Sequence, residues 1–210
     1  MRDTPVILVH GFMAPSALMR PMRRQLRRAG FQAYLSNLSP LCIQDVRRLA
    51  AELSETIERV CFVEDVEQVN VVGVSLGGAT ALYYQQVVAS SLRIRRLIAV
   101  GTPFLGTEAA RPVLPLLGRV SAGVWQTLPE SDFVADLVAT GIPEGMTLTS
   151  IAMEGDPISP PAQCAFPGAE NIVLRGIRSP MTHQLLVASP VALRGIVAAL
   201  DRDDTERQAS

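Results

Sequence analysis

Short runs of apolar residues alternate along the chain with longer segments in which apolar residues recur every three or four positions. A continuous apolar run is typical of a strand buried on both faces of a parallel sheet, whereas the longer period indicates an amphipathic helix. The runs predict six strands, at residues 6–9, 31–35, 69–72, 94–100, 146–153 and 171–174. The periodic segments predict four helices, at residues 16–29, 43–63, 76–90 and 190–200. This alternation predicts an α/β fold: a mostly parallel sheet of about six strands, with helices on both faces.

The alternation fails between residues 101 and 145, a segment that contains five prolines and the single tryptophan of the chain. Long inserts in compact domains more often form lids or binding loops than simple connections. We therefore expect a short lid-like insert at about residues 104–145. The length fits one domain, which we place at residues 1–200. The polar residues 201–210 are expected to form a flexible tail.

A serine flanked by glycines stands between the third predicted strand and the helix that follows it. Residues 73–77 read Gly-Val-Ser-Leu-Gly, which places Ser75 at the centre. Between a strand and a helix, this pattern indicates a nucleophile elbow, in which the serine is held on a sharp turn. The alternative is a glycine-rich turn with a helix-capping serine, and the flanking strand and helix favour the elbow.

A serine hydroxyl needs a neighbouring base to act as a nucleophile. His183 is the candidate, because it is the histidine that follows the last predicted strand. An acid should fix the imidazole tautomer, and Asp156 lies just past a strand, between Gly155 and Pro157. The chain order Ser75, Asp156, His183 is the order that elbow-type hydrolases use.

Other acidic residues compete with Asp156 for the role of the acid. Glu154 is predicted to lie still within the strand, and Asp132 and Asp136 are predicted to lie on a helix of the insert. For Asp156 itself, the alternative is a residue that caps its own turn. For His183 the alternative is a surface residue beside a helix.

Five polar residues follow predicted strands and should converge at the carboxyl edge of the sheet: His10, Ser75, Thr102, Asp156 and His183. The oxyanion of an acyl-transfer intermediate needs two N–H donors near the serine. We expect them from the backbone of Leu76 and of Phe12, with Met13 as the second choice. We expect His10 to shape this loop rather than act as a base.

Composition excludes several classes of protein. A net charge of −1 over 210 residues argues against a nucleic-acid partner. The chain contains no lysine, which excludes Schiff-base chemistry and the phosphate-loop lysine. The cysteines Cys42, Cys61 and Cys164 are odd in number and widely spaced, so we expect free, buried thiols and no metal site. A Cys42–Cys61 bridge is the alternative.

The N-terminus shows neither the pattern of a signal peptide nor an apolar stretch long enough to cross a bilayer. If Met1 is the native start, we expect a cytoplasmic protein without a transmembrane segment.

Four motifs together resemble the bacterial lipases and esterases of the α/β-hydrolase superfamily, in particular the small members similar to triacylglycerol lipases. These motifs are Val6–Phe12, Gly73–Gly78, the Gly-Thr-Pro block of Gly101–Thr107, and Gly155–Pro157 with the later His183. A Pro-x-Ser segment at residues 129–131 is also similar. The sequence departs from many relatives at Val74, where they carry histidine, and at Leu76, where methionine is common.

The resemblance implies a single-domain α/β-hydrolase fold that cleaves carboxylic esters through an acyl-serine intermediate, with no metal or organic cofactor. It carries Ser75, Asp156 and His183 over as nucleophile, acid and base. We expect a small ester or lipid as the substrate, transient contact with a lipid interface, and a role in lipid metabolism. The predicted substrate-binding residues are Met13, Phe104, Leu117 and Trp125.

Three alternatives stay open at this point. The same triad serves an acyltransferase, a thioesterase or an amidase. The fold also occurs in non-catalytic binding proteins, although an intact triad argues against that class. Finally, the apolar residues of the insert could belong to the core instead of an acyl pocket.

Overall fold

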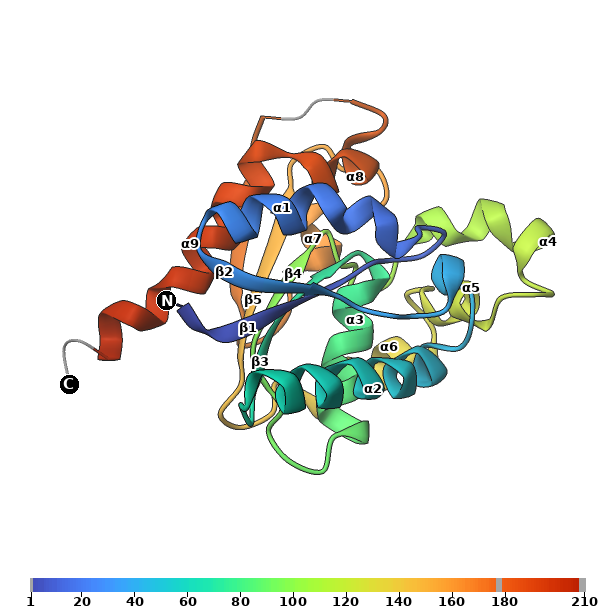
Figure 1. Ribbon diagram of the computed structural model, residues 1–210. Coiled ribbons are helices and arrows are strands. Elements are labelled where there is room, and N and C mark those ends of the chain that lie inside the picture. Colours follow the sequence, from blue (N-terminus) through green and yellow to red (C-terminus); the bar gives the residue numbers. More distant parts are fainter. Residues whose placement is uncertain (1, 177–178, 208–210) are drawn as a thin grey trace.

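Six strands form one parallel sheet in the computed structural model, which describes residues 2–176 and 179–207 (Figure 1). The strand order across the sheet is β2-β1-β3-β4-β5-β6, and neighbouring strands are parallel throughout. The strands are β1 (Arg2–Val9), β2 (Phe31–Leu35), β3 (Val69–Val74), β4 (Ile94–Val100), β5 (Thr147–Met153) and β6 (Glu170–Leu174). The predicted fold class is therefore confirmed, and each strand coincides with a predicted apolar run.

Helices cover both faces of this sheet, as the sequence predicts. The helices α1 (Arg20–Arg28) and α9 (Pro190–Arg207) lie on one face, and α2 (Val46–Glu64) and α3 (Leu76–Tyr83) lie on the other (Figure 1). Successive side chains of β1 alternate between the two sides: Ile7 and Val9 join one buried cluster, while Val6 and Leu8 join the other. Because both faces are covered, β1 is apolar without interruption from Val6 to Val9.

Two predicted helices begin or end with a different helical geometry. The helix expected at residues 16–29 begins as a 3-10 turn, η1 (Ser16–Met19), before α1. The helix expected at residues 76–90 changes from α3 to a π-helical turn, η3 (Tyr84–Val88). The wider turn places Gln85 against the start of β4, where its Oε1 accepts the N–H groups of Arg93 (2.9 Å) and Ile94 (2.7 Å).

The segment from 101 to 145 is more regular than predicted. It contains η4 (Glu108–Val113), α4 (Leu114–Leu117), α5 (Ala122–Gln126) and α6 (Asp132–Thr140). Three of these elements begin at a capping hydroxyl, because Thr107, Ser121 and Ser131 accept the N–H groups of Ala109, Val124 and Val134. Most of these helices are shorter than two turns, so no helical period is visible in the sequence.

The C-terminal part adds short elements and a longer final helix. The short ones are η2 (Pro40–Cys42) before α2, α7 (Pro161–Cys164), α8 (Thr182–Leu185) and η5 (Leu186–Ala188). Helix α9 continues to Arg207, seven residues past its predicted end, because no glycine or proline follows Leu200 to stop it. Residues 208–210 of the expected tail, and residues 177–178 of the predicted loop before His183, lie outside the described residues.

Among the described residues, no single helix has both the length and the hydropathy needed to cross a bilayer. The pair Thr182–Ala188 and Pro190–Arg202, bent by 58°, meets both criteria only when its two pieces are counted together.

Candidate active site

Ser75 lies on a strained turn between β3 and α3. Its backbone adopts φ 54° and ψ −129°, a conformation that non-glycine residues rarely occupy. Three backbone or side-chain bonds hold the turn: the N–H of Ser75 donates to the carbonyl of Val100 (2.9 Å), and its own carbonyl accepts from Thr102 Oγ1 (2.8 Å) and from the N–H of Gly78 (3.0 Å). Strain of this kind costs roughly 1–3 kcal/mol and persists only where the surrounding structure enforces it.

The glycines on either side of Ser75 are required by close backbone approaches. A Cβ atom on Gly73 would lie 2.5 Å from the Cα of Gly78. A Cβ atom on Gly77 would lie 2.5 Å from the carbonyl oxygen of Val9. The Gly-x-Ser-x-Gly pattern is therefore a steric requirement of this strand-to-helix turn.

Ser75, His183 and Asp156 form a chain of hydrogen bonds. Nε2 of His183, on α8, lies 2.9 Å from Ser75 Oγ, and its Nδ1 lies 2.8 Å from Asp156 Oδ2, just past β5. The carboxyl group is fully buried and the imidazole is only 11% exposed. With Nδ1 protonated, the ring donates to Asp156 and its Nε2 can accept the proton of the serine hydroxyl.

Asp156 also caps its own turn. Its Oδ1 accepts the backbone N–H groups of Ile158 (2.9 Å) and Ser159 (3.0 Å), while Oδ2 faces His183. The contacts that cap the turn and the contact with His183 therefore use different oxygens of the same carboxylate. The turn fixes the carboxylate, and the fixed carboxylate orients the imidazole.

The competing acids lie elsewhere. Glu154 is exposed and forms an ion pair with Arg175 at 3.3 Å. Asp132 begins α6, and the carbonyl of Asp136 accepts a bond from Thr140 within the same helix. Of the four acids considered from the sequence, Asp156 is the one that reaches His183.

The loop after β1 lies against the nucleophile turn. A Cβ atom on Gly11 would stand 2.7 Å from Ser75 Cβ and 3.2 Å from the backbone nitrogen of Leu76. The N–H of Met13 donates to the carbonyl of Leu41 at 2.5 Å, so it is already engaged. Of the two candidates in this loop, Phe12 is the one whose N–H makes no hydrogen bond to another described residue. Leu76 is the first residue of α3, and its N–H has no partner within that helix.

His10 is buried beneath this loop, with a relative exposure of 1%. Burial lowers the pKa of its imidazole, against the smaller opposing effect of hydrogen bonds to the backbone of Gly11 and Ala14. A neutral ring bonded to this backbone shapes the loop, as the sequence predicts for His10.

A cavity of about 470 Å³ opens beside Ser75. Most of its lining is apolar, and Ser75 and His183, but not Asp156, reach it. Met13 lines the cavity as predicted. The apolar lining also includes Leu18, Met19, Ala109, Ala110, Val113, Val124, Ile158 and Val187.

Three predicted substrate-binding residues do not line this cavity. Phe104 is fully buried and packs edge-on against Phe166, with ring centroids 5.0 Å apart. Leu117 packs against a small cluster within the insert itself, formed by Ala110, Val124 and Leu128. Trp125 is half exposed, and its Nε1 donates to the carbonyl of Gly118 at 2.8 Å. Apolar character alone does not fix the direction in which a turn, at Phe104, or a short helix, at Leu117 and Trp125, presents a side chain.

The sequence analysis missed several residues that line the cavity beside Ser75, among them Ile158, Val187 and Ala109. Ile158 lies two positions after Asp156, and Val187 lies four positions after His183. Closeness in sequence to these two residues is therefore the signal that could have identified them as cavity-lining residues. Ala109 carries no such signal, because it is small and lies on a six-residue 3-10 helix.

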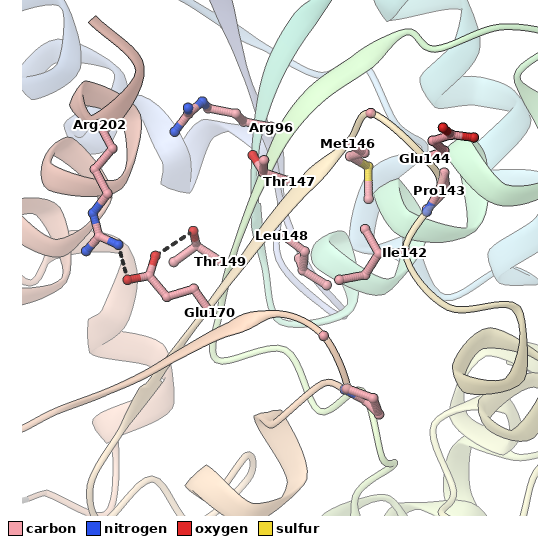
Figure 2. A pocket seen from close by; sticks show the side chains of 13 residues that line it. Arg96, Ile142, Pro143, Glu144, Met146, Thr147, Leu148, Thr149, Glu170 and Arg202 are labelled. Atoms are coloured by element: carbon pink, nitrogen blue, oxygen red, sulfur yellow. Dashed lines mark hydrogen bonds and ion pairs between the residues drawn. The ribbon is translucent and has the colours of Figure 1, made fainter. Parts of the chain in front are cut away.

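A larger depression, of about 670 Å³, lies at the opposite end of the sheet, at the start of β5. Figure 2 shows Arg202 and Glu170 pointing toward one another at one side of this depression, with Glu144 at the other side. Arg202 bonds to Glu170, which also accepts a bond of 3.3 Å from Thr149 Oγ1. The lining of this depression contains no histidine, cysteine or serine, so the depression lacks the serine–histidine or cysteine–histidine pair of a nucleophilic site.

Within residues 2–176 and 179–207, no cluster of three or more histidine, cysteine or acidic side chains is arranged to hold a metal ion. Cys42, Cys61 and Cys164 are free and buried, so the alternative Cys42–Cys61 bridge is not formed. Burial raises the pKa of the Cys42 and Cys164 thiols to about 12.

Comparisons with known proteins agree with this architecture. Residues 4–137 match a family model described as the alpha/beta hydrolase fold. The lipase BlEst2 of Bacillus licheniformis, in mature form, is similar over 94% of this chain and 91% of its own (TM-score 0.78, 16% identity). Lipase B of Aspergillus fumigatus is similar over 94% of this chain and 52% of its own (TM-score 0.69, 20% identity).

The phospholipase PlaB of Legionella pneumophila, solved with thio-NAD, is similar over 94% of this chain and 58% of its own (TM-score 0.71, 14% identity). At these identities, the likeness establishes the fold. Among curated proteins, no sequence matches.

Proposed function

We propose that this chain, which belongs to the alpha/beta hydrolase fold family, is a serine hydrolase that cleaves carboxylic esters with an apolar acyl group. The observation that carries the proposal is the hydrogen-bonded chain from Ser75 Oγ through His183 to Asp156, at 2.9 and 2.8 Å. Such a chain supplies a nucleophile, a base and an orienting acid in one place.

The proposed reaction begins when Nε2 of His183 takes the hydroxyl proton and Ser75 Oγ attacks the ester carbonyl carbon. The carbonyl π electrons move to oxygen, and the N–H groups of Phe12 and Leu76 stabilise that oxyanion. The C–O bond of the alcohol then breaks, and His183 returns its proton to the departing alkoxide. This leaves an acyl group on Ser75. His183 then deprotonates a water, which attacks the acyl carbon. The bond between that carbon and Ser75 Oγ breaks, the proton on His183 returns to Ser75 Oγ, and the acid leaves. Asp156 stabilises the imidazolium each time it forms.

The cavity beside Ser75 supports an apolar acyl group. A volume of about 470 Å³ holds about fifteen groups of the size of water or methylene, at about 30 Å³ each. No aspartate, glutamate or arginine lines the cavity, so a charged acyl group would lose hydration there without gaining a partner. We therefore place small esters and single-chain lipid esters among the substrates.

The surface near the cavity supports transient contact with lipid. Helix α4 has no buried residue, and its Leu116 is 79% exposed. The helix directly follows η4, whose Val113 lines the cavity. An apolar surface continuous with an acyl cavity would let a substrate enter from a lipid aggregate.

Acyltransferases, thioesterases and amidases use the same acyl-enzyme and stay as alternatives. Hydrolysis of p-nitrophenyl esters, measured beside labelling of Ser75 by a fluorophosphonate, tests the proposal. Ser75→Ala should remove both signals and keep the folded circular-dichroism spectrum, and the exposed serine variant Ser90→Ala should keep both. Turnover by Ser75→Ala at the wild-type rate would reject the assignment of the nucleophile.

A second measurement concerns the acyl class and the physical state of the substrate. Initial rates on short and long acyl esters, below and above the solubility limit of each ester, separate a simple esterase from a lipase. A rate that rises sharply above the solubility limit would support a lid that opens at an interface, and a flat response would reject it.

A further inference from the structure

Five non-glycine residues adopt a positive φ in the part of the chain that the structure describes. One is Ser75 itself, and Asp65 ends α2. The other three are Met13 (φ 54°), Leu41 (φ 71°) and Cys42 (φ 47°), which come from two loops far apart in sequence. Strained backbone of this kind is retained where the structure enforces it, often beside a functional site.

The two strained loops bind each other on both sides of Phe12. On one side, the carbonyl of Leu41 accepts the N–H of Met13 at 2.5 Å. On the other side, Sγ of Cys42 lies 3.3 Å from Nδ1 of His10. Cys42 and His10 are each 1% exposed, so water does not compete for the contact between these two side chains. The Phe12 N–H therefore lies between two fixed points.

The turn that makes these contacts is itself anchored. The N–H and the hydroxyl of Ser39 both donate to the carboxylate of Glu52 on α2, each at 2.7 Å. The carbonyl of Ile43, directly after the turn, accepts a bond of 2.6 Å from the hydroxyl of Ser121 at the start of α5. Residues 39–43 thus connect the loop after β1 to the body of the domain.

We propose that the left-handed turn at Leu41–Cys42 positions the oxyanion loop, and that Cys42 is a positioning residue acting through His10. The inference rests on the proposed function, because it assigns a purpose to the Phe12 N–H. The carbonyl of Leu41 engages the N–H of Met13 and so leaves the Phe12 N–H as the donor. The contact with Cys42 holds His10, two positions before Phe12, so the loop cannot rotate away from Ser75.

Loss of this support should lower the rate of acylation more than the affinity for the ester. Removal of an oxyanion donor costs about a hundredfold to a thousandfold in kcat. A shift of about 1 Å in a reacting group can cost about a hundredfold. A positioning residue that permits a smaller shift should therefore cost about tenfold.

Cys42→Ala tests the proposal, and Cys61→Ala, another buried cysteine, is the matched control. With p-nitrophenyl butyrate, Cys42→Ala should lower kcat by about tenfold with KM within about twofold of wild type. Cys61→Ala should change neither constant by more than about twofold. Equal kcat values in wild type and folded Cys42→Ala would overturn the proposal.

Amide hydrogen exchange gives a readout that is independent of turnover. In the wild type, the Met13 amide should exchange slowly and the Phe12 amide rapidly. In Cys42→Ala, protection at Met13 should fall at least tenfold, while protection in β3 stays unchanged. Slow exchange at Met13 in both proteins would show that the turn does not depend on Cys42, and would reject its role.

Leu41→Gly covers the case in which Cys42→Ala does not fold. Glycine keeps the carbonyl and adopts the left-handed conformation without strain, so the variant should be about as stable as wild type. Glycine also leaves the turn free to move among other conformations, so the turn no longer fixes the loop after β1. The positioning role predicts a lower kcat despite that stability, whereas a structural role alone predicts an unchanged kcat. Fluorophosphonate labelling of wild-type Ser75 separates the positioning role from the proposed function. If the wild type is labelled and active but the Leu41 and Cys42 variants have an unchanged kcat, this inference alone is rejected. If the wild type is neither labelled nor active, the proposed function is rejected.

Discussion

The hydroxyl of Thr102 donates a hydrogen bond of 2.8 Å to the carbonyl oxygen of Ser75. Thr102 follows β4 and is fully buried, so one strand end supports the strained turn at the next strand. The same side chain occupies the space beside Gly78, at the start of α3. The turn that carries Ser75 therefore depends on Thr102, which is not part of the hydrogen-bonded chain of Ser75, His183 and Asp156.

Thr102→Val should weaken this turn. The substitution keeps the shape of the side chain and removes the donor, while the carbonyl of Ser75 still accepts from Gly78. The loss of one hydrogen bond should lower the free energy of unfolding by about 0.5–1.5 kcal/mol. The kcat for p-nitrophenyl butyrate should fall as well, because Ser75 loses a constraint. Urea unfolding and steady-state kinetics measure both effects. Thr140→Val, at an exposed threonine of α6, is the control and should leave both unchanged.

Asp156→Asn should nearly abolish turnover while the domain stays folded. The amide oxygen can still accept the N–H groups of Ile158 and Ser159, but the amide nitrogen then faces Nδ1 of His183. That arrangement favours the wrong imidazole tautomer, and in the trypsin-like case this costs about ten-thousandfold in kcat. Glu154→Gln, at the exposed acid nearby, should leave kcat within about twofold. Comparable losses in both variants would reject the assignment of Asp156.

Gly11→Ala should inactivate the protein. The new methyl group would lie 2.7 Å from Ser75 Cβ and 2.8 Å from the carbonyl of Val74, so the loop or the nucleophile must move. Gly30→Ala is a useful control, because no atom lies within 4 Å of its Cβ and its positive φ of 90° costs stability only. Ester turnover and thermal unfolding, measured on both variants, separate the two effects. Activity in Gly11→Ala would mean that this loop does not approach the serine during the reaction.

Ala109→Trp should shorten the acyl chains that the protein accepts. The indole would fill part of the 470 Å³ cavity and exclude the far end of a long chain. Each methylene that loses its apolar contact costs about 0.8 kcal/mol, or about fourfold in rate. The measurement is kcat/KM across p-nitrophenyl esters from acetate to decanoate. Trp125→Ala, which lies outside the cavity, should leave the chain-length profile unchanged.

His10 should make stability depend on pH below about 6.5, the ordinary pKa of histidine. Burial lowers the pKa of His10 in the folded protein, so the unfolded chain binds a proton first as pH falls. Stability is therefore complete above pH 6.5 and declines below it, by at most about 1.4 kcal/mol per pH unit. Urea unfolding between pH 7.5 and 5.0 measures this slope. The slope should be smaller in His10→Phe, and an equal slope in both proteins would contradict the prediction.

The strands and the convergence of Ser75, Asp156 and His183 could be predicted because each has a local signal. Buried parallel strands are continuous apolar runs, and the elbow is a fixed pattern of glycines around Ser75. The positions of Asp156 and His183 followed from their places after strands, since parallel strands end at one edge of the sheet.

The binding cavity could not be predicted, because it depends on how short helices are rotated. Whether Trp125 or Ala109 faces the cavity is decided by contacts between elements, not by apolar character. The turn at Leu41–Cys42 left no signal either, because neither residue type favours a positive φ. Its contacts with Met13 and His10 join parts of the chain that no local pattern connects.

The strand order has a consequence for synthesis of the chain on the ribosome. After β1 and β2, each new strand pairs with the one made before it or with β1, so the sheet can grow as the N-terminal part emerges first. The elbow has its anchors once Val100 and Thr102 have left the exit tunnel, well before His183 is translated. A nascent chain therefore carries a shaped serine without its base, and acyl transfer in the proposed reaction begins only after His183 has also emerged from the ribosome.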